Sequence, residues 1–432
     1  MSGYFLQLAL QNLRRHVWLT VLIVLAVSLG IGSSMTVYSI LRAMSANPIP
    51  WKSDQLHTVQ FDNFGPEGRP GPDLPVMSSY KDVVAFHRDM PALRKAGMFE
   101  ISVPVTTGDS QVAPVLSEGR ATHADFFSMF DVPFASGRPW SAADDEARAN
   151  VVVLTWPLAS SLFPEEDAVG KSVSIEGREY RVVGVTGDWA PSPRFYDVGQ
   201  NGGSAYDPPP QVFLPLETAL ERNIQSNGSI TCLTFGGDLR ASECVWLQFW
   251  MEADEDGIRK VHDYLRAYAA EQQRAGRFNW KPEFRLLDVA EWLEHMKVAP
   301  DEIRVATWVA AGFLLVCLVN AVALMLARSS RRAGEFSLRR ALGASRRNLF
   351  LQGVWESLLV GLIGGAVGLL WTWAGLVALR NLVPPAIQST TRLQPAVVML
   401  TLLLALAATA LAGLFPAWRA SRTAGALRLK SL

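Results

Sequence analysis

Cysteine and charge are both scarce in this chain of 432 residues, which has 3 cysteines and only 19% charged residues. So few cysteines exclude a fold held together by a network of disulfides. The 40 basic and 40 acidic residues cancel, and a chain without net positive charge is not expected to bind nucleic acid. With 49% hydrophobic residues, the chain is also too apolar for an intrinsically disordered protein.

The common signatures of catalysis and metal binding are missing as well. The sequence has no HExxH, no Gly-x-Ser-x-Gly and no Cys/His ligand spacing. Gly170-Lys171-Ser172 resembles the end of a phosphate-binding loop, but Glu165 stands where that loop needs its first glycine. We interpret the tripeptide as the entry to a hairpin that turns at Glu176-Gly177. We therefore expect no catalytic residue, and no metal or cofactor bound by this chain.

Long runs without charge are the most informative feature that is present. Val17 to Leu41, Val305 to Ala327 and Leu393 to Trp418 carry no charged residue, and Leu349 to Leu379 carries only Glu356. Each run exceeds the roughly 20 residues that cross about 30 Å of hydrocarbon as a helix. The first run is longer than the apolar core of a cleaved signal peptide, which favours an uncleaved anchor. The expected fold is an α-helical membrane protein with four transmembrane helices.

The arginines predict the topology. Arg14 and Arg15 precede the first run, seven arginines lie between 328 and 348, and the tail after 418 has only basic charges. The positive-inside rule places these three regions in the cytoplasm. The expected segments are a cytoplasmic amphipathic elbow at 1–16, transmembrane helices at 17–45, 304–328, 349–380 and 395–418, an extracytoplasmic domain at 46–303, a cytoplasmic coupling loop at 329–348, a short external loop at 381–394 and a cytoplasmic tail at 419–432.

Residues 46–303 predict a large α+β extracytoplasmic domain between helices one and two, compatible with a division into two lobes. This segment has 23 basic and 38 acidic residues, a net charge of −15. Short runs rich in Val, Ile, Phe and Tyr predict strands at His57–Phe61, Val103–Thr107, Asn150–Leu154, Ser172–Ile175, Tyr180–Val185 and Gln211–Leu214. Apolar residues at helical spacing predict helices at Ser79–His87, Asp125–Phe130, Asp256–Arg274 and Asp288–Met296.

Two loops and three cysteines leave alternatives open. Gly65–Pro75 and Ala190–Pro210 are rich in proline and glycine, and the second is compatible with an exposed excursion or with a contact to substrate or a partner. Cys232 and Cys244 lie on the oxidising side, where we predict a disulfide, although the sequence leaves two free thiols open. Cys317 is interpreted as a small apolar residue of the second membrane helix.

The arginine-rich loop predicts a short helix from Glu335 to Leu342 that ends at Gly343, followed by a new helix with Ser345 as its N-cap. We expect Phe336, Leu338 and Leu342 to form an apolar surface and Arg339 and Arg340 to project charge. A basic loop that binds lipid headgroups and a docking element for a cytoplasmic partner are both compatible with this pattern. Glu356 lies about one turn inside the third helix and is interpreted as an interfacial ion pair with the arginines.

Several stretches resemble a known family. RRALGASRRNLFLQGVWESL in the loop, GLFPAWRASR at the end of the last helix and LALQNLRRHVWLTVLIVLAVSLGIGSSM at the N-terminus are similar to MacB/FtsX-type ABC transporter permeases. VGKSVSIEGREYRVVGV and QVFLPL are similar to the periplasmic domain of that family. No nucleotide-binding domain precedes the first helix, so we expect the ATPase to be a separate chain.

The resemblance implies a dimeric lever in the bacterial cytoplasmic (inner) membrane rather than a channel. A separate ABC ATPase dimer would bind ATP-Mg, and its closure would move the segment from Glu335 to Ala344. The second permease would be another copy or a similar chain, and some family members also work with a periplasmic membrane-fusion protein. Gly30, Gly32, Ser33 and Ser34 would permit close helix approach at packing or dimer contacts.

Members of the family export drugs or peptides, or extract lipoproteins, and the resemblance implies a permease of this kind. The alternative is an FtsX-like transducer that regulates an extracytoplasmic hydrolase without moving a substrate. A membrane-anchored external enzyme is a third possibility, which the missing catalytic signatures disfavour.

Overall fold

The computed structural model describes residues 7–9, 11, 13, 15, 17–69, 71, 73–108, 113–164, 167–199, 205–233, 238–331, 334–335, 338–339, 342–380 and 395–422. Internal contacts divide the chain into two units. The helical unit consists of Met1–Ser45 and Ala299–Leu432, and the α+β domain consists of Ala46–Val298. The predicted large domain between the first and second apolar helices is therefore present as a compact body of its own.

Four long helices make up most of the helical unit, and each contains a segment long and apolar enough to cross a membrane. They are α2 (Val17–Met44), α11 (Asp301–Arg331), α13 (Arg346–Leu379) and α15 (Pro395–Arg422). Helix α11 continues three residues past the predicted end at 328, and α15 continues four residues past 418. Ser345 caps α13 as predicted, because its side chain accepts a hydrogen bond from the Asn348 backbone N–H.

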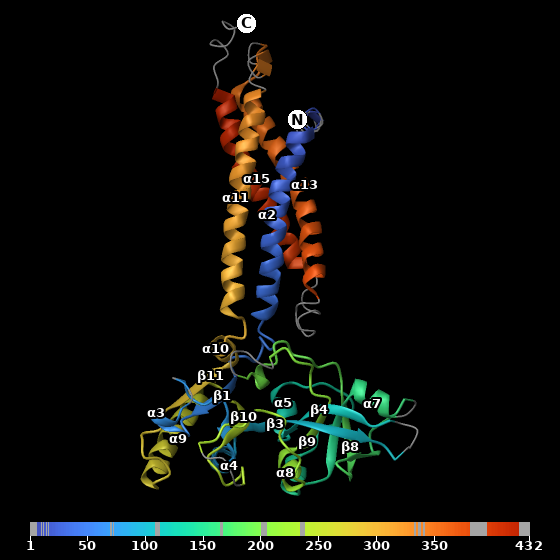
Figure 1. Ribbon diagram of the computed structural model, residues 1–432, viewed down its shortest axis with the longest axis vertical. Helices are drawn as coiled ribbons and strands as arrows, with labels where there is room; N and C mark the ends of the chain where they lie inside the picture. Colours follow the sequence, from blue (N-terminus) through green and yellow to red (C-terminus); the bar gives the residue numbers. More distant parts are fainter. Residues whose placement is uncertain are drawn as a thin grey trace. The chain divides into compact units, whose positions relative to one another are not determined.

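Helix α2 packs against both α11 and α13, and α13 packs against α15 (Figure 1). Ile23, Val27 and Ile31 recur every four residues on α2 and are fully buried, as expected for one face of a helix. A Cβ at Gly364 or Gly368 of α13 would contact α2 side chains at ordinary or tight van der Waals distance. The glycines thus let two helix backbones approach closely where the bilayer supplies no hydrophobic driving force between them.

The strands of the α+β domain form one 11-stranded sheet in the order β11-β1-β10-β3-β4-β9-β6-β8-β5, with β2 paired to β10 and β7 paired to β3 and β8. Strand pairing therefore does not divide the domain into two lobes. The strands are β1 (Leu56–Phe61), β2 (Ser78–Ser79), β3 (Arg94–Thr106), β4 (Val115–Thr122), β5 (Phe134–Gly137), β6 (Val151–Thr155), β7 (Ser172–Ile175), β8 (Arg178–Thr186), β9 (Val212–Pro215), β10 (Val245–Glu252) and β11 (Phe284–Asp288).

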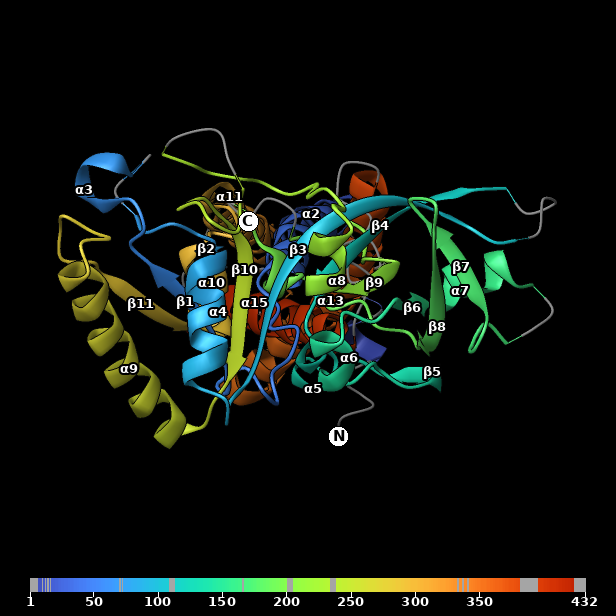
Figure 2. The ribbon, with the colours of Figure 1, turned by 90° about the horizontal axis from the view of Figure 1, so that it is seen from below.

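Shorter helices accompany the sheet. They are α3 (Gly65–Gly68), α4 (Tyr80–Asp89), α5 (Asp125–Met129), α6 (Ala142–Glu146), α7 (Trp156–Leu162), the 3₁₀ turn η1 (Phe195–Asp197), α8 (Leu216–Glu221), α9 (Glu255–Arg274) and α10 (Val289–His295). In Figure 2, α9 runs along the β11 edge, and α4 lies beside β10. Val261 and Leu265 of α9 enter the main core, which fits the apolar face predicted for this helix.

The six predicted strands and four predicted helices of this domain are all present, with ends shifted by a few residues. The largest shift is in β3, which begins nine residues before the predicted Val103. The hairpin β7–β8 has the predicted turn, and both Glu176 and Gly177 have positive φ (51° and 74°), as a tight two-residue turn requires.

The proline- and glycine-rich loop at 190–210 is not wholly an exposed excursion, and its contact to a substrate or partner stays a prediction. Phe195, Tyr196 and Asp197 of η1 are buried, so this part of the loop is anchored in the domain core. Residues 200–204 of the same loop lie outside the described part of the chain. The Gly65–Pro75 loop begins with α3.

Candidate functional site

A buried ion pair joins two helices of the helical unit near the arginine-rich loop. Arg328, near the end of α11, places Nη2 3.5 Å from Oε2 of Glu356 on α13. Their side chains are only 7% and 14% exposed. If the helix ends moved apart, each charge would be left buried without its partner, which costs free energy. This contact therefore holds the two helix ends in one arrangement. The predicted ion pair of Glu356 with an arginine is thus present, and its partner is Arg328.

Gln352 extends this contact toward the loop. Its Nε2 donates to Oε1 of Glu356 at 3.3 Å, one helical turn away, and its Oε1 accepts from Nη1 of Arg339 at 3.1 Å. Arg339 belongs to the loop segment, so the loop is hydrogen-bonded into α13. Arg339 is half-buried and its guanidinium reaches Gln352, which is neutral, so the prediction that Arg339 projects charge stays a prediction. We refer to Arg328, Glu356, Gln352 and Arg339 as the polar relay.

A second contact links the loop to the segment before α2. Nη1 of Arg15 lies 2.6 Å from Oε1 of Glu335. Both side chains are partly open to solvent, and exposed pairs of this kind contribute only about 0–1 kcal/mol. The pair therefore orients the loop more than it stabilises the protein.

Two leucines of the loop face outward. Leu338 and Leu342 are 64% and 80% exposed, and the Leu342 backbone N–H donates to the Leu338 carbonyl, so they lie one helical turn apart. The Ala344 N–H donates to the Arg339 carbonyl, and Gly343 has φ +95°, which ends the turn in the way predicted. Phe336 and Arg340 lie outside the described residues. The described leucines form a small apolar surface that no described residue covers.

The four small residues predicted to allow close packing lie on α2. A Cβ at Gly30 would lie 2.8 Å from the Cβ of Cys317 on α11, and a Cβ at Gly32 would overlap Trp371 on α13. The Ser34 hydroxyl donates to the Ala310 carbonyl of α11 at 2.8 Å, whereas Ser33 donates to Gly30 on its own helix. Three of the four thus serve helix packing within this chain.

The α+β domain contains the other predicted site, the cysteine pair. Cys232 and Cys244 form a disulfide that connects a loop to the start of β10. Cys317 is free and buried in the helical unit. The disulfide joins the chain before and after residues 234–237, which lie outside the described part.

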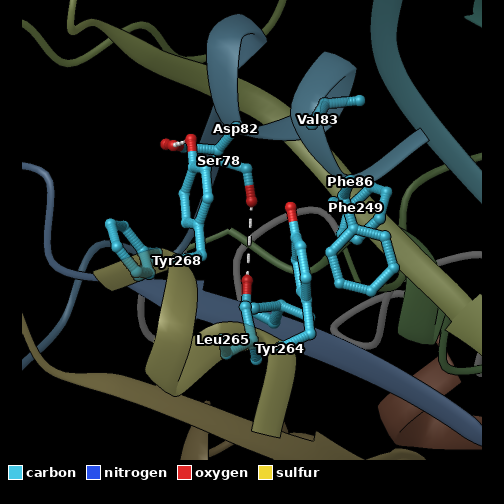
Figure 3. A pocket seen from close by; sticks show the side chains of 10 residues that line it. Ser78, Asp82, Val83, Phe86, Phe249, Tyr264, Leu265 and Tyr268 are labelled. Carbon is cyan, nitrogen blue, oxygen red and sulfur yellow. Dashed lines mark hydrogen bonds between the residues drawn. The ribbon is translucent and has the colours of Figure 1, made fainter. Parts of the chain in front are cut away.

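A small cavity lies between α4, α9 and β10 (Figure 3). Its free volume of about 20 Å³ leaves room for little more than a water molecule. Tyr268 from α9 donates to Asp82 of α4 at 2.8 Å, and Arg277 binds the same carboxylate at 2.6 Å. Burial acts to raise the pKa of Asp82, but the charge and hydrogen bonds of Arg277 outweigh it and hold the pKa below its ordinary value. This site is structural packing rather than a ligand site.

A cluster of buried charges lies on the sheet near η1. Arg120 of β4 contacts Asp197 of η1 directly, and its Nη2 lies 3.6 Å from Glu100 of β3. Arg194 lies 3.2 Å from Asp197. Burial, followed by the neighbouring Asp197, raises the pKa of Glu100 to about 7. The cluster anchors the loop at 190–199 to the sheet. Within the described residues, no group of three or more His, Cys, Asp or Glu side chains could hold a metal ion.

Sequence reasoning missed most of the polar relay. Glu356 was visible as the one charge inside an apolar run, but Arg328 was one arginine among seven, and Gln352 carries no charge. The available signal was the spacing of Gln352 and Glu356, which puts both side chains on one face of a helix.

Two family models match the chain. The model of the MacB-like periplasmic core domain matches residues 20–255, and that of the FtsX-like permease C-terminal region matches residues 308–424. The first covers more than half of the chain. The second covers most of α11, all of α13 and α15, and the loop that carries Leu338 and Leu342.

Individual relatives are proteins of the same kind as these two family models. The chain is 22% identical to the macrolide export ATP-binding/permease protein MacB of Wolinella succinogenes over 84% of this chain and 51% of that protein. It is 22% identical to the uncharacterized ABC transporter permease YvrN of Bacillus subtilis over 96% of this chain and 97% of that protein. The chain thus spans about half the length of the MacB relatives that it matches.

Among solved structures, the chain is similar to the periplasmic region of MacB from Actinobacillus actinomycetemcomitans, with 15% sequence identity. The alignment covers 56% of this chain and 92% of the MacB chain. The TM-score of this comparison is 0.35.

Proposed function

Because the chain belongs to the MacB/FtsX-like family of ABC transporter permeases, we propose that it transmits ATP-driven movement from a separate ABC ATPase to its α+β domain. The ATPase dimer binds ATP-Mg, and the α+β domain handles a drug, peptide or lipoprotein substrate. The observation that carries the proposal is the exposed pair Leu338 and Leu342, on a segment whose Arg339 is hydrogen-bonded into α13.

The contacts of the helical unit support a route for this movement. The ATPase binds Leu338 and Leu342, and displacement of the loop acts on α13 through Arg339 and Gln352. Glu356 passes the displacement to Arg328 of α11, and the glycine contacts of α13 pass it to α2. Helices α2 and α11 are the two elements joined covalently to the α+β domain, at Ser45 and Ala299. The movement therefore reaches that domain through its two connections.

The arginine distribution supports an orientation in which both termini and the Leu338–Leu342 surface face the cytoplasm of a bacterial inner membrane. The substrate then stays outside the bilayer, and the polar relay lies at the cytoplasmic end of the helices. A second permease copy completes the transmembrane part of the transporter.

The double substitution of Leu338→Asp with Leu342→Asp tests the docking surface. Two carboxylates there remove the apolar contact, so the ATPase that co-purifies with the wild-type chain should be lost, with affinity reduced at least about a hundredfold. Co-purification and direct titration of the ATPase onto the purified chain in nanodiscs measure this. The chain should remain folded, because both side chains are exposed.

The matched control is Asn348→Asp, which adds a carboxylate to the exposed first turn of α13, outside the leucine pair. A negative charge there is favourable for the helix. The control should retain the ATPase. Wild-type ATPase affinity in the double leucine variant would exclude this surface as the docking site.

A further inference from the structure

The α+β domain has an open cleft of about 320 Å³ that the proposed coupling route does not use. Its walls come from three separate parts of the chain: the segment before β1, the turn after α5 and the loop after β8. The side chains used below are Trp51, Phe130, Asp131, Asp188, Trp189 and Phe195, and three prolines, Ile49 and Ala190 complete the lining.

The aromatic wall is held rigidly. Trp189 stacks on Tyr196 with a centroid distance of 5.3 Å, and its Nε1 donates to the Phe130 carbonyl at 3.3 Å. Phe130 in turn packs edge-on against the buried Phe195 at 5.1 Å. Phe130 and Phe195 are themselves buried, so they hold Trp189 in place, and the preformed apolar surface open to a ligand is that of Trp189 and the prolines.

Trp51 closes the other side and is 66% exposed. Its Nε1 donates to Oδ2 of Asp131 at 2.9 Å, and the Lys52 Nζ lies 3.2 Å from Oδ1 of the same carboxylate. Asp131 thus fixes the indole and is paired with Lys52, whose Nζ also lies 3.3 Å from Glu252. The indole ring is left with exposed surface at the cleft.

Asp188 supplies a charge that is not balanced. It is exposed at the cleft, and no hydrogen bond or ion pair joins it to another residue in the described part of the chain. The whole 46–303 segment carries a net charge of −15, which raises the local concentration of cations. A cleft with aromatic walls and one free carboxylate favours a ligand that is cationic at one point and apolar elsewhere.

We propose that this cleft binds an organic ammonium ion carried on an apolar or aromatic body. The cation lies against the Trp51 ring and within reach of Asp188, where the ring quadrupole and the carboxylate both attract it. The apolar body packs on Trp189 and the prolines. The volume lies at the lower end of the range for small-molecule sites, which fits one such group. The inference does not rest on the coupling route, because binding needs no ATPase.

The test is calorimetric titration of the full chain, purified in an uncharged maltoside detergent, with benzyltrimethylammonium as the probe. We expect saturable binding of one probe per chain with Kd below about 1 mM, weakened by raising the salt concentration because Asp188 is exposed. Tetramethylammonium lacks the apolar body and benzyl alcohol lacks the charge, so each should bind at least about tenfold more weakly.

Asp188→Asn and Trp51→Ala should each weaken probe binding by about tenfold. Asp263→Asn on α9 and Trp156→Ala on α7 remove an exposed carboxylate and an exposed indole elsewhere on the domain, and they should leave it unchanged. Thermal unfolding checks that all four variants fold. Equal affinity for benzyl alcohol, or unchanged affinity in both cleft variants, would overturn the proposal.

The ammonium group can belong to a soluble compound or to a lipid headgroup, and nanodiscs separate the two sources. The comparison needs lipids of equal net charge, so phosphatidylethanolamine discs are compared with discs of an uncharged glycolipid that has no ammonium group. If phosphatidylethanolamine weakens probe binding, the headgroup amine occupies the cleft. Equal affinity in both discs assigns the cleft to a soluble cation. Both outcomes require the Asp188 and Trp51 dependence already described.

Discussion

Arg120 shows at the scale of a single residue how the α+β domain tolerates buried charge. Its guanidinium contacts Asp197, approaches Glu100, and lies 5.2 Å from the Tyr196 ring centroid. It therefore neutralises one carboxylate and covers an aromatic face at the same time. A neutral side chain of similar length could fill the space but could not balance the charge of Asp197.

Replacing Arg120 by Met should destabilise the domain by about 3 kcal/mol, because Asp197 keeps only Arg194 as a counter-charge. For a domain of this size that corresponds to a fall of roughly 6–12 °C in Tm, measured by near-ultraviolet circular dichroism of the full chain. Arg178→Met, at an exposed position of β8, should change Tm by less than about 2 °C. A fall as small as that of this control would contradict the charge-balancing role.

His87 and His123 form a second residue-scale feature. Their rings stack with a centroid distance of 4.1 Å inside the domain. Burial lowers the pKa of His87 to about 2, helped by His123 and Lys95, and burial lowers the pKa of His123 to about 4. Both rings are therefore neutral in the folded domain and protonate readily only on unfolding. Their contribution to stability is present above pH 6.5 and is lost as the pH falls below it.

His87→Phe should reduce this acid sensitivity. Each histidine contributes a slope of up to about 1.4 kcal/mol per pH unit below pH 6.5, so the variant should lose stability less steeply between pH 6.5 and 4.5. The measurement compares Tm of the two proteins across this range. Glu100, whose raised pKa has the opposite effect on stability between about pH 4.5 and 7, is common to both proteins and cancels in the difference. Parallel pH profiles would contradict the assignment.

At the scale of elements, the polar relay joins α11, α13 and the loop. None of these residues is unusual by itself, and the contacts among them form only when the helices pack. The sequence placed Leu338 and Leu342 on an apolar surface, because helical spacing suffices for that. It could not show that Arg339 hydrogen-bonds to Gln352, because that contact depends on how the loop folds back onto α13.

Glu356→Arg should destabilise the helical unit by roughly 3–5 kcal/mol, because it buries a second positive charge beside Arg328. Exchanging both residues, with Arg328→Glu and Glu356→Arg together, restores an opposite pair and should recover more than half of the loss. Tm of the full chain in detergent measures both. The two single variants, Arg328→Glu and Glu356→Arg, are measured as well. If the loss of stability in the double variant equals the sum of their two losses, the two side chains do not interact and the pair does not join the helices.

At the scale of the whole molecule, the two units were predictable to different degrees. The absence of charge over long runs sufficed to predict α2, α11, α13 and α15. In the α+β domain, runs of β-branched residues predicted six strands, whereas β2, β4, β5, β10 and β11 were not predicted. Strand β4 has polar residues at half its positions, which hides its pattern. The single sheet could not be predicted, because β1 and β10 pair across some 190 residues of sequence and no local pattern records that.

The proposed coupling requires that the α+β domain move only when a companion ATPase uses ATP. Spin labels at Asp263→Cys on α9 and Arg331→Cys at the end of α11, in a Cys317→Ser background, test it most directly. Labelled chain is diluted with unlabelled chain in nanodiscs, so that pulsed electron paramagnetic resonance measures distances within one chain. We predict a distance change on addition of ATP that requires the ATPase and is abolished by Leu338→Asp with Leu342→Asp. The same change with ATP alone, or no change during turnover with the ATPase bound, would contradict the account.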